Sequence, residues 1–162
     1  MIKTIKGDLI ELAFAGEFDI IAHGCNCQGI MGAGIAAQIK QHIPGAAKAD
    51  KAYKKAMNDV FDYNHPVFML GTLSFHLVSS LSHPMFAVAN LYTQVQPGAN
   101  FDLNYGLVPA LKKLNYIHRG RRIGLPMIGA GIGGGDWNQI KEVIPRLLDN
   151  CEVTIVEYEP KQ

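Results

Sequence analysis

Apolar positions form short runs and helical stripes that alternate along the chain. The runs, rich in branched and aromatic residues, predict strands at 2–5, 19–23, 73–78, 85–92, 123–128 and 153–158. Apolar residues at helical spacing predict helices at 35–43, 46–60, 107–117 and 136–148, with a short helix or turn at 9–14. Strands that alternate with helices predict an α/β fold. We expect a three-layer α/β/α sandwich around a mixed, mostly parallel sheet of about six strands.

Prolines set several of these boundaries. The isoleucine stripe in 35–43 ends before Pro44, so the helix stops there. Pro109 belongs in the first turn of its helix, whereas Pro145 falls late in the last helix and predicts a kink or an early end. The segment 94–104 combines a proline, a glycine and several amide side chains, which predicts a mobile loop.

Two glycine-rich loops each lie between a predicted strand and the helix that follows it. The first is 29–34, with glycine at three of six positions, and the second is 129–135, with glycine at five of seven. A glycine loop before a helix aims free backbone N–H groups and the positive end of the helix dipole at one spot, which suits a phosphate. Two such loops favour a diphosphate held from both sides over glycine-rich turns without a ligand.

Two common classes of nucleotide-binding protein do not fit this sequence. Gly129, Gly131 and Gly134 match the G-x-G-x-x-G spacing, but in a dinucleotide-binding domain that motif opens the fold. Here only one predicted helix and one predicted strand follow it. No G-x-x-x-x-G-K-[ST] sequence occurs, which excludes a P-loop nucleotide hydrolase.

Composition and charge limit the class of protein further. The 162 residues are 48% hydrophobic and 18% charged, which predicts one packed domain over 1–162. A net charge of +1 gives no basis for non-specific nucleic-acid binding. No apolar run reaches the roughly 18 residues of a membrane span and no signal peptide is evident, so no membrane contact is expected. Three cysteines, an odd number, predict a reduced, intracellular protein, and hence a cytoplasmic location.

Four side chains at the ends of predicted strands or loops each have two interpretations. His23 ends a predicted buried strand and is either a satisfied core histidine or a catalytic group. Asp136 is either the N-cap of the last helix or a general base for an attacking water. Asp8 is either a cap or a carboxylate that recognises adenine. Tyr158 either covers the core at an edge or stacks on a base.

His23, Cys25 and Cys27 alternate along one stretch, as metal ligands can. Structural zinc sites use cysteine pairs at wider spacing and a fourth ligand, and no second pair is present. Small buried residues in a tight loop are the preferred interpretation of both cysteines. Neither a metal nor a cofactor is therefore expected, and no Ser/His/Asp or Cys/His triad can be assigned.

Taken together, these motifs resemble a macrodomain, the α/β/α module that binds ADP-ribose. The resemblance spans nearly the whole chain and rests on Gly7-Asp8, the HGCNC sequence at 23–27, MGAGIA at 31–36 and IGAGI at 128–132. It is closest to the subclass that holds small ADP-ribose-1″-phosphate phosphatases and terminal ADP-ribose glycohydrolases. The HGCNC sequence, with Gly29 two residues after it, is similar to the phosphatases, and the MGAGIA segment is similar to the glycohydrolases.

This resemblance implies roles for single residues. Asp8 would accept a hydrogen bond from the adenine amino group, with Leu9 beside it. Tyr158 would lie near the adenine, and Asn26 would hold the distal ribose. His23 lies where the phosphatase-type members have a histidine implicated in activity. The other implied ligand-binding residues belong to the loops: Cys25, Met31, Gly32, Ala33, Gly34, Ile35, Gly129, Ala130, Gly131, Ile132, Gly133 and Gly134.

Two departures from the glycohydrolases argue against their covalent route. Those proteins use a lysine shortly after the strand predicted here at 85–92, and this chain has Gln94 in that place. Their catalytic aspartate falls on Gly133 or Gly134 here, with Asp136 slightly later. A Schiff-base intermediate is therefore not expected.

Three hypotheses follow. The favoured one is a metal-independent phosphoric monoester hydrolase that converts ADP-ribose-1″-phosphate to ADP-ribose and phosphate, with His23 and Asp136 as catalytic residues. The second is a non-catalytic ADP-ribose reader. The third is a hydrolase of ADP-ribosyl esters, such as ADP-ribosyl-glutamate or O-acetyl-ADP-ribose. The expected ligand is ADP-ribose or ADP-ribose-1″-phosphate, an ADP-ribosylated protein is a further partner, and a monomer is expected.

Overall fold

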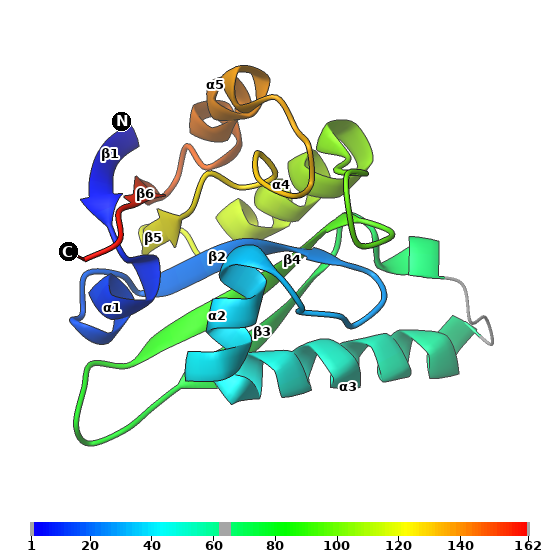
Figure 1. Ribbon diagram of the computed structural model, residues 1–162, viewed down its shortest axis with the longest axis horizontal. Helices are drawn as coiled ribbons and strands as arrows, with labels where there is room; N and C mark the ends of the chain where they lie inside the picture. Colours follow the sequence, from blue (N-terminus) through cyan, green and yellow to red (C-terminus); the bar gives the residue numbers. More distant parts are fainter. Residues whose placement is uncertain (1, 62–65, 162) are drawn as a thin grey trace.

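The computed structural model describes residues 2–61 and 66–161 and is built around one sheet of six strands (Figure 1). The strands are β1 (Ile2–Gly7), β2 (Ile20–Asn26), β3 (Leu73–Val78), β4 (Phe86–Gln94), β5 (Arg122–Leu125) and β6 (Glu152–Tyr158). Their order across the sheet is β1-β6-β5-β2-β4-β3. Every neighbouring pair is parallel except β3 and β4, which are antiparallel. The predicted mixed, mostly parallel sheet is confirmed.

Helices cover both faces of the sheet, as predicted (Figure 1). One face carries α1 (Leu9–Phe14), α2 (Gly34–His42) and α3 (Pro44–Phe61), and the other carries α4 (Val108–Ile117) and α5 (Trp137–Leu147). Each layer has its own apolar core, with Ile21 and Val88 in the first and Leu91 and Ile123 in the second. The strands are apolar on both faces because both faces are covered. Within 2–61 and 66–161, no helix has the length and apolar character needed to cross a bilayer.

Local signals place most helix ends. The Asp8 carboxylate caps α1 by accepting two backbone N–H groups of the first turn, at 2.9 and 3.1 Å. Pro109 lies in the first turn of α4, where a missing N–H costs nothing. Pro145 lies inside α5, and the helix ends at Leu147, two residues later.

The strand predicted at 123–128 is shorter than expected. β5 ends at Leu125, because Pro126 has no N–H to add to the ladder. Ile128 is nevertheless buried in the core at 2% exposure. Its burial accounts for the apolar signal that extended the predicted strand.

The loop predicted at 94–104 also has more structure than expected. β4 continues to Gln94, and a π-helical turn, η2 (Leu103–Leu107), leads into α4. The Asp102 carboxylate caps this turn by accepting the Tyr105 N–H at 2.8 Å. One further short helix, the 3₁₀ turn η1 (Pro66–Met69), precedes β3.

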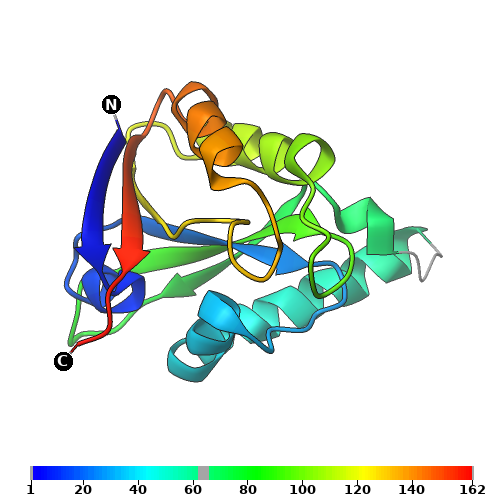
Figure 2. The same cartoon turned by 45° about the horizontal axis from the view of Figure 1, so that its top comes forward.

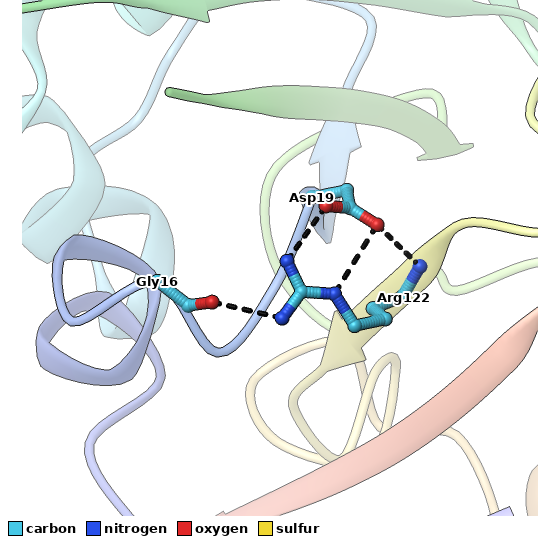
Figure 3. Close-up of polar contacts among 3 residues, drawn as sticks. All are labelled: Gly16, Asp19 and Arg122. Carbon is cyan, nitrogen blue, oxygen red and sulfur yellow. Dashed lines mark hydrogen bonds and ion pairs between the residues drawn. The ribbon is translucent and has the colours of Figure 1, made fainter. Parts of the chain in front are cut away.

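An ion pair joins the starts of β2 and β5 (Figure 3). The Arg122 guanidinium donates to Asp19 Oδ1 at 2.8 Å, and the Arg122 backbone N–H donates to Oδ2 at 2.9 Å. A second guanidinium nitrogen donates to the Gly16 carbonyl at 2.9 Å. The hydrogen bond from Arg122 holds the pKa of the Asp19 carboxyl below its ordinary value. This contact fixes the amino ends of the two strands whose carboxyl ends lead into the glycine loops.

Candidate functional site

A cavity of about 410 Å³ lies at the edge of the sheet where β2, β4 and β5 end. Three loops contribute most of its walls, namely the segments 30–36, 94–98 and 126–133. Figure 2 shows these three loops close to one another, near the middle of the view. Open α/β sheets bind ligands outside the carboxyl ends of their strands, so this cavity is the candidate site.

The first wall contains the amino terminus of α2. Ala33 is the N-cap, and no side chain caps this end of the helix. The N–H groups of Gly34, Ile35 and Ala36, in the first turn, therefore lack intrahelical acceptors. All of these residues line the cavity. The wall thus offers an anion free N–H groups together with the positive end of the helix dipole.

The second glycine loop turns back on itself and faces the first. The Gly134 N–H donates to the Gly131 carbonyl at 3.1 Å. Gly129 and Gly134 have φ angles of +78° and +75°, a region that favours glycine. A β-carbon added at Gly34 would lie 3.8 Å from Ile132 Cδ1, so the two loops meet across the cavity. The structure therefore brings both glycine loops to one site.

Neutral polar side chains gather at the β2–β4 end of the cavity, where Asn26, Thr93 and Gln94 line it. The Asn26 amide is also used within its own loop. Its Nδ2 donates to the Ile30 carbonyl at 2.8 Å, and its Oδ1 accepts the Gln28 N–H at 2.9 Å. Asn26 therefore shapes the first wall as well as facing the cavity.

Within the described ranges, no acidic, basic or histidine side chain lines the cavity. Cys25 does line it, but burial raises the pKa of its thiol well above the ordinary value. Burial also raises the pKa of the Cys27 thiol to about 12, so both thiols are neutral at pH 7. The cavity would hold an anion through backbone N–H groups rather than through charged side chains.

His23 lies beneath the cavity and not in its wall. The residue is 0% exposed, and its Nε2 donates to Asn90 Oδ1 at 2.7 Å. The Asn90 amide in turn donates to the Ala46 carbonyl at 3.1 Å and to Ser74 Oγ at 3.2 Å. Burial lowers the pKa of His23 to about 4, so the ring is neutral at pH 7.

The same buried network continues to α3. Ser74 Oγ lies 2.9 Å from Tyr92 Oη, which donates to Asp50 Oδ1 at 2.9 Å. Burial raises the pKa of both the Asp50 carboxyl and the Tyr92 hydroxyl. Because buried polar groups need partners, this network fixes how β3, β4 and α3 pack below the site.

Comparison with known proteins now identifies the fold. The Macro domain family matches residues 22–144, more than half of the chain. The chain belongs to the Macro domain family. The macrodomain of Thermus aquaticus DarG has a similar structure, with a TM-score of 0.68, 26% sequence identity and 99% of each chain covered. The resemblance inferred from the sequence motifs is confirmed.

Three relatives align along this macrodomain. An uncharacterized 17.5 kDa protein of Enterobacteria phage T4 is 35% identical over 99% of this chain and 98% of its own length. The ADP-ribose 1″-phosphate phosphatase of Debaryomyces hansenii is 30% identical over 96% of this chain and 98% of its own length. The DNA ADP-ribosyl glycohydrolase of Thermus aquaticus is 27% identical over 99% of this chain, which spans 41% of that protein.

Most of the predicted ligand-binding residues line the macrodomain cavity. They are Cys25, Asn26, Gly32, Ala33, Gly34, Ile35, Gly129, Gly131, Ile132 and Gly133. Ala130 and Gly134 belong to the second loop but lie outside the lining. Met31 and Leu9 are each 4% exposed, and their side chains pack in the core.

Asp8, Tyr158 and Asp136 lie outside this cavity. Asp8 lines a second hollow, formed with the segment 159–161. Tyr158 pairs in register with Gly7, the residue before Asp8, and is 73% exposed. Asp136 is exposed and caps α5, its Oδ1 accepting a backbone N–H at 2.9 Å. Both aspartates cap a helix through Oδ1.

Several lining residues were missed by the sequence analysis. Thr93 and Gln94 end β4, which is the neighbour of β2 in the sheet, and Pro97 and Gly98 follow it. Parallel neighbouring strands end at the same edge, so the residues after β4 belong beside the first glycine loop. The order of strands carries this information, and the local sequence does not.

The two cysteines and His23 do not form a metal centre. No group of three or more His, Cys, Asp or Glu side chains in the described part of the chain is arranged to hold a metal ion. Cys25 and Cys27 are free and buried, and both belong to a small apolar cluster that includes Met69 and Tyr92. They fill space under the loop that leads to α2.

Proposed function

We propose that this macrodomain binds ADP-ribose in the cavity and hydrolyses ADP-ribose-1″-phosphate to ADP-ribose and phosphate. The macrodomain is an ADP-ribose-binding fold. The observation that carries the proposal is the pair of facing glycine loops, whose backbone N–H groups suit a diphosphate. The phosphatase of Debaryomyces hansenii adds support, since it and this chain align over nearly their full lengths.

The order of the strands gives the ligand a direction. From β1 to β4, the strand ends carry Asp8, Tyr158, the second glycine loop, the first glycine loop and the segment after Gln94. With the diphosphate between the glycine loops, adenine would lie toward Asp8 and Tyr158. The distal ribose would lie toward Asn26, Thr93 and Gln94, whose neutral polar groups suit sugar hydroxyls.

The proposed reaction replaces the phosphorus–oxygen bond to O1″ by a bond from phosphorus to a water oxygen. The leaving O1″ takes up the proton that the attacking water gives up, and it becomes the free hydroxyl of ADP-ribose. In a site lined by backbone N–H groups, positioning and electrostatic stabilisation supply most of the rate. The amide and hydroxyl groups of Asn26, Thr93 and Gln94 would orient the sugar, and a phosphate oxygen of the substrate is the nearest base for the water.

His23 and Asp136 have supporting roles in this proposal, in place of the direct proton transfer first expected. His23 lies under Cys25, with 3.6 Å between Nε2 and Sγ, and so supports the floor of the cavity. Asp136 starts α5 directly after the second glycine loop. Each residue would position the loop beside it.

A non-catalytic ADP-ribose reader is the second candidate. The specific observation in its favour is the cavity lining, which has no acidic, basic or histidine side chain within the described residues. A protein that only binds ADP-ribose needs the backbone N–H groups of the two glycine loops and no proton donor. The reader and the phosphatase share the same binding mode, so only turnover separates them.

The experiment that tests the proposal offers purified protein three substrates in parallel: ADP-ribose-1″-phosphate, O-acetyl-ADP-ribose and a glutamate-linked ADP-ribosyl peptide. Release of inorganic phosphate from the first, with little turnover of the other two, supports the phosphatase. Heat of ADP-ribose binding without turnover of any substrate would favour the non-catalytic ADP-ribose reader. Faster cleavage of either ester would replace the phosphatase by an ester hydrolase.

Asp136→Asn should leave phosphate release within about 3-fold of the unmodified protein, because asparagine caps helices as well as aspartate does. Loss of a general base would instead reduce turnover by on the order of 10²–10⁴. Initial rates at saturating ADP-ribose-1″-phosphate measure the difference. Asp136→Ala is the matched control, since it removes the cap as well as the charge. A large loss of phosphate release in Asp136→Asn would mean that Asp136 is a catalytic residue.

A further inference from the structure

The segment 94–101, called the strap here, forms a closed loop at the end of β4. Its two ends meet where the Asp102 N–H donates to the Thr93 carbonyl at 2.8 Å. Pro97 and Gly98, at its tip, line the cavity. The strap is therefore a wall of the site and not a connection that passes it by.

Side chains within the strap hold its shape. The Gln94 amide donates to the Gln96 and Gly98 carbonyls at 2.7 and 2.8 Å. The Asn100 side chain accepts the Gln96 N–H at 3.0 Å and donates back to the Gln96 and Pro97 carbonyls at 2.8 and 3.1 Å. These bonds satisfy the Gln96 N–H and three consecutive carbonyls, those of Gln96, Pro97 and Gly98, in a segment whose composition predicted a mobile loop.

The strap is bonded to the loop that leads from β2. The Val95 carbonyl accepts the Cys27 N–H at 3.1 Å and the Gln28 side-chain amide at 3.2 Å. Lys54 on α3 then donates to the Gln28 carbonyl at 3.0 Å. The strap, the first loop and α3 are thus joined in series.

The strap is also joined to the second glycine loop. The Phe101 N–H donates to the Gly133 carbonyl at 3.1 Å. The Phe101 ring lies so close to Gly129 and Gly135 that a β-carbon on either would collide with it. A β-carbon on Gly134 would lie 3.2 Å from the Ala99 Cβ. The strap therefore connects the two glycine loops across the β4 end of the cavity.

The β4 end is where the proposed binding mode places the distal ribose and any group attached at C1″. We infer that the strap admits only a small substituent there, so that the ligand is a free nucleotide sugar such as ADP-ribose or its 1″-phosphate. A protein or a nucleic acid joined to ADP-ribose through C1″ would be brought against the strap, whose tip lines this end of the cavity. This inference rests on the proposed function for the direction of the ligand, but it does not depend on turnover.

The test is a competition experiment against ADP-ribose labelled on its adenine. The competitors are free ADP-ribose, a glutamate-linked ADP-ribosyl peptide and an ADP-ribosylated single-stranded oligonucleotide. We expect each linked competitor to bind at least about 10-fold more weakly than free ADP-ribose. A smaller difference for either one overturns the inference. Discrimination without phosphate release would leave the inference in place and reject only the phosphatase, whereas no binding of free ADP-ribose would reject both.

A strap variant tests the cause of the discrimination. Replacement of residues 96–100 by two glycines removes the tip and the bonds made by Asn100. The ratio of linked to free dissociation constants should then fall at least about 5-fold. Replacement of residues 79–82, in the β3–β4 turn at the other end of β4, by two glycines is the matched control and should leave the ratio unchanged. An unchanged ratio in the strap variant would assign the discrimination elsewhere and overturn the inference.

Discussion

Gly131→Asp should weaken ADP-ribose binding by about 100-fold, because the new carboxylate would face the diphosphate in a cavity whose described lining has no basic side chain to compensate it. Gly131 lines the cavity, and a β-carbon there meets no heavy atom within 4 Å. It is also absent from the glycines with positive φ. A side chain at this position therefore adds charge to the site without straining the fold. Calorimetric titration with ADP-ribose measures the loss.

Gly131→Asn is the matched control, because asparagine has nearly the same shape and no charge. Its affinity should stay within about 5-fold of the unmodified protein. Thermal unfolding of both variants checks that the fold is intact. If the aspartate variant binds ADP-ribose as tightly as the asparagine variant, the diphosphate does not lie beside Gly131.

Acid should lower the free energy of unfolding by about 3 kcal/mol through His23 alone. In the unfolded chain the ring takes up a proton near the ordinary pKa of 6.5, whereas in the folded protein burial lowers the pKa of His23 to about 4. The contribution of His23 is therefore complete above pH 6.5. It is lost as the pH falls from 6.5 to about 4, and it is constant below that.

The measurement is the free energy of unfolding by urea at several pH values between 7 and 4, for the unmodified protein and for His23→Gln. Subtracting the two curves isolates His23 from Asp50, since the raised pKa of the Asp50 carboxyl acts in the opposite direction. The difference should shrink by about 3 kcal/mol over this pH range. Parallel curves would mean that the His23 ring is not buried as a neutral group.

Most of the fold could be predicted because its signals are local. The isoleucine stripe of α2, the cap at Asp8 and the early proline of α4 are all visible in a few consecutive residues. The error at β5 has a similarly local cause: Ile128 is apolar and buried, but Pro126 ends the ladder before it. Burial alone does not distinguish a strand from a buried turn.

The candidate site could be predicted only in part. The glycine loops can be recognised in the sequence, because so many glycines in a short segment indicate special backbone geometry. The order of the strap could not be predicted in this way, because part of it comes from partners far away in the chain, such as Cys27 and Gly133. Its amide-rich composition suits both a mobile loop and a hydrogen-bonded one. The three-dimensional arrangement decides between the two.

His23 shows the same limit. Its place at the end of a buried strand beside a glycine loop fits a core residue and a catalytic residue equally well. The difference depends on Asn90 and Ser74, which lie on neighbouring strands and give the ring a buried partner network. A polar residue at a buried strand position, such as Asn90, is a signal for such a network, but it does not name the partner.

The most direct test of the claim that both glycine loops hold the diphosphate is an amide chemical-shift titration. Isotope-labelled protein is titrated with ADP-ribose, ADP and adenosine. The account predicts that the amides of Gly34 and Ile35 in the first loop shift together with those of Gly131 and Gly133 in the second. They should follow one dissociation curve with ADP-ribose and with ADP, and stay in place with adenosine, which lacks the diphosphate. Movement confined to one loop, or an equal response to adenosine, would contradict the claim that both loops grip the diphosphate.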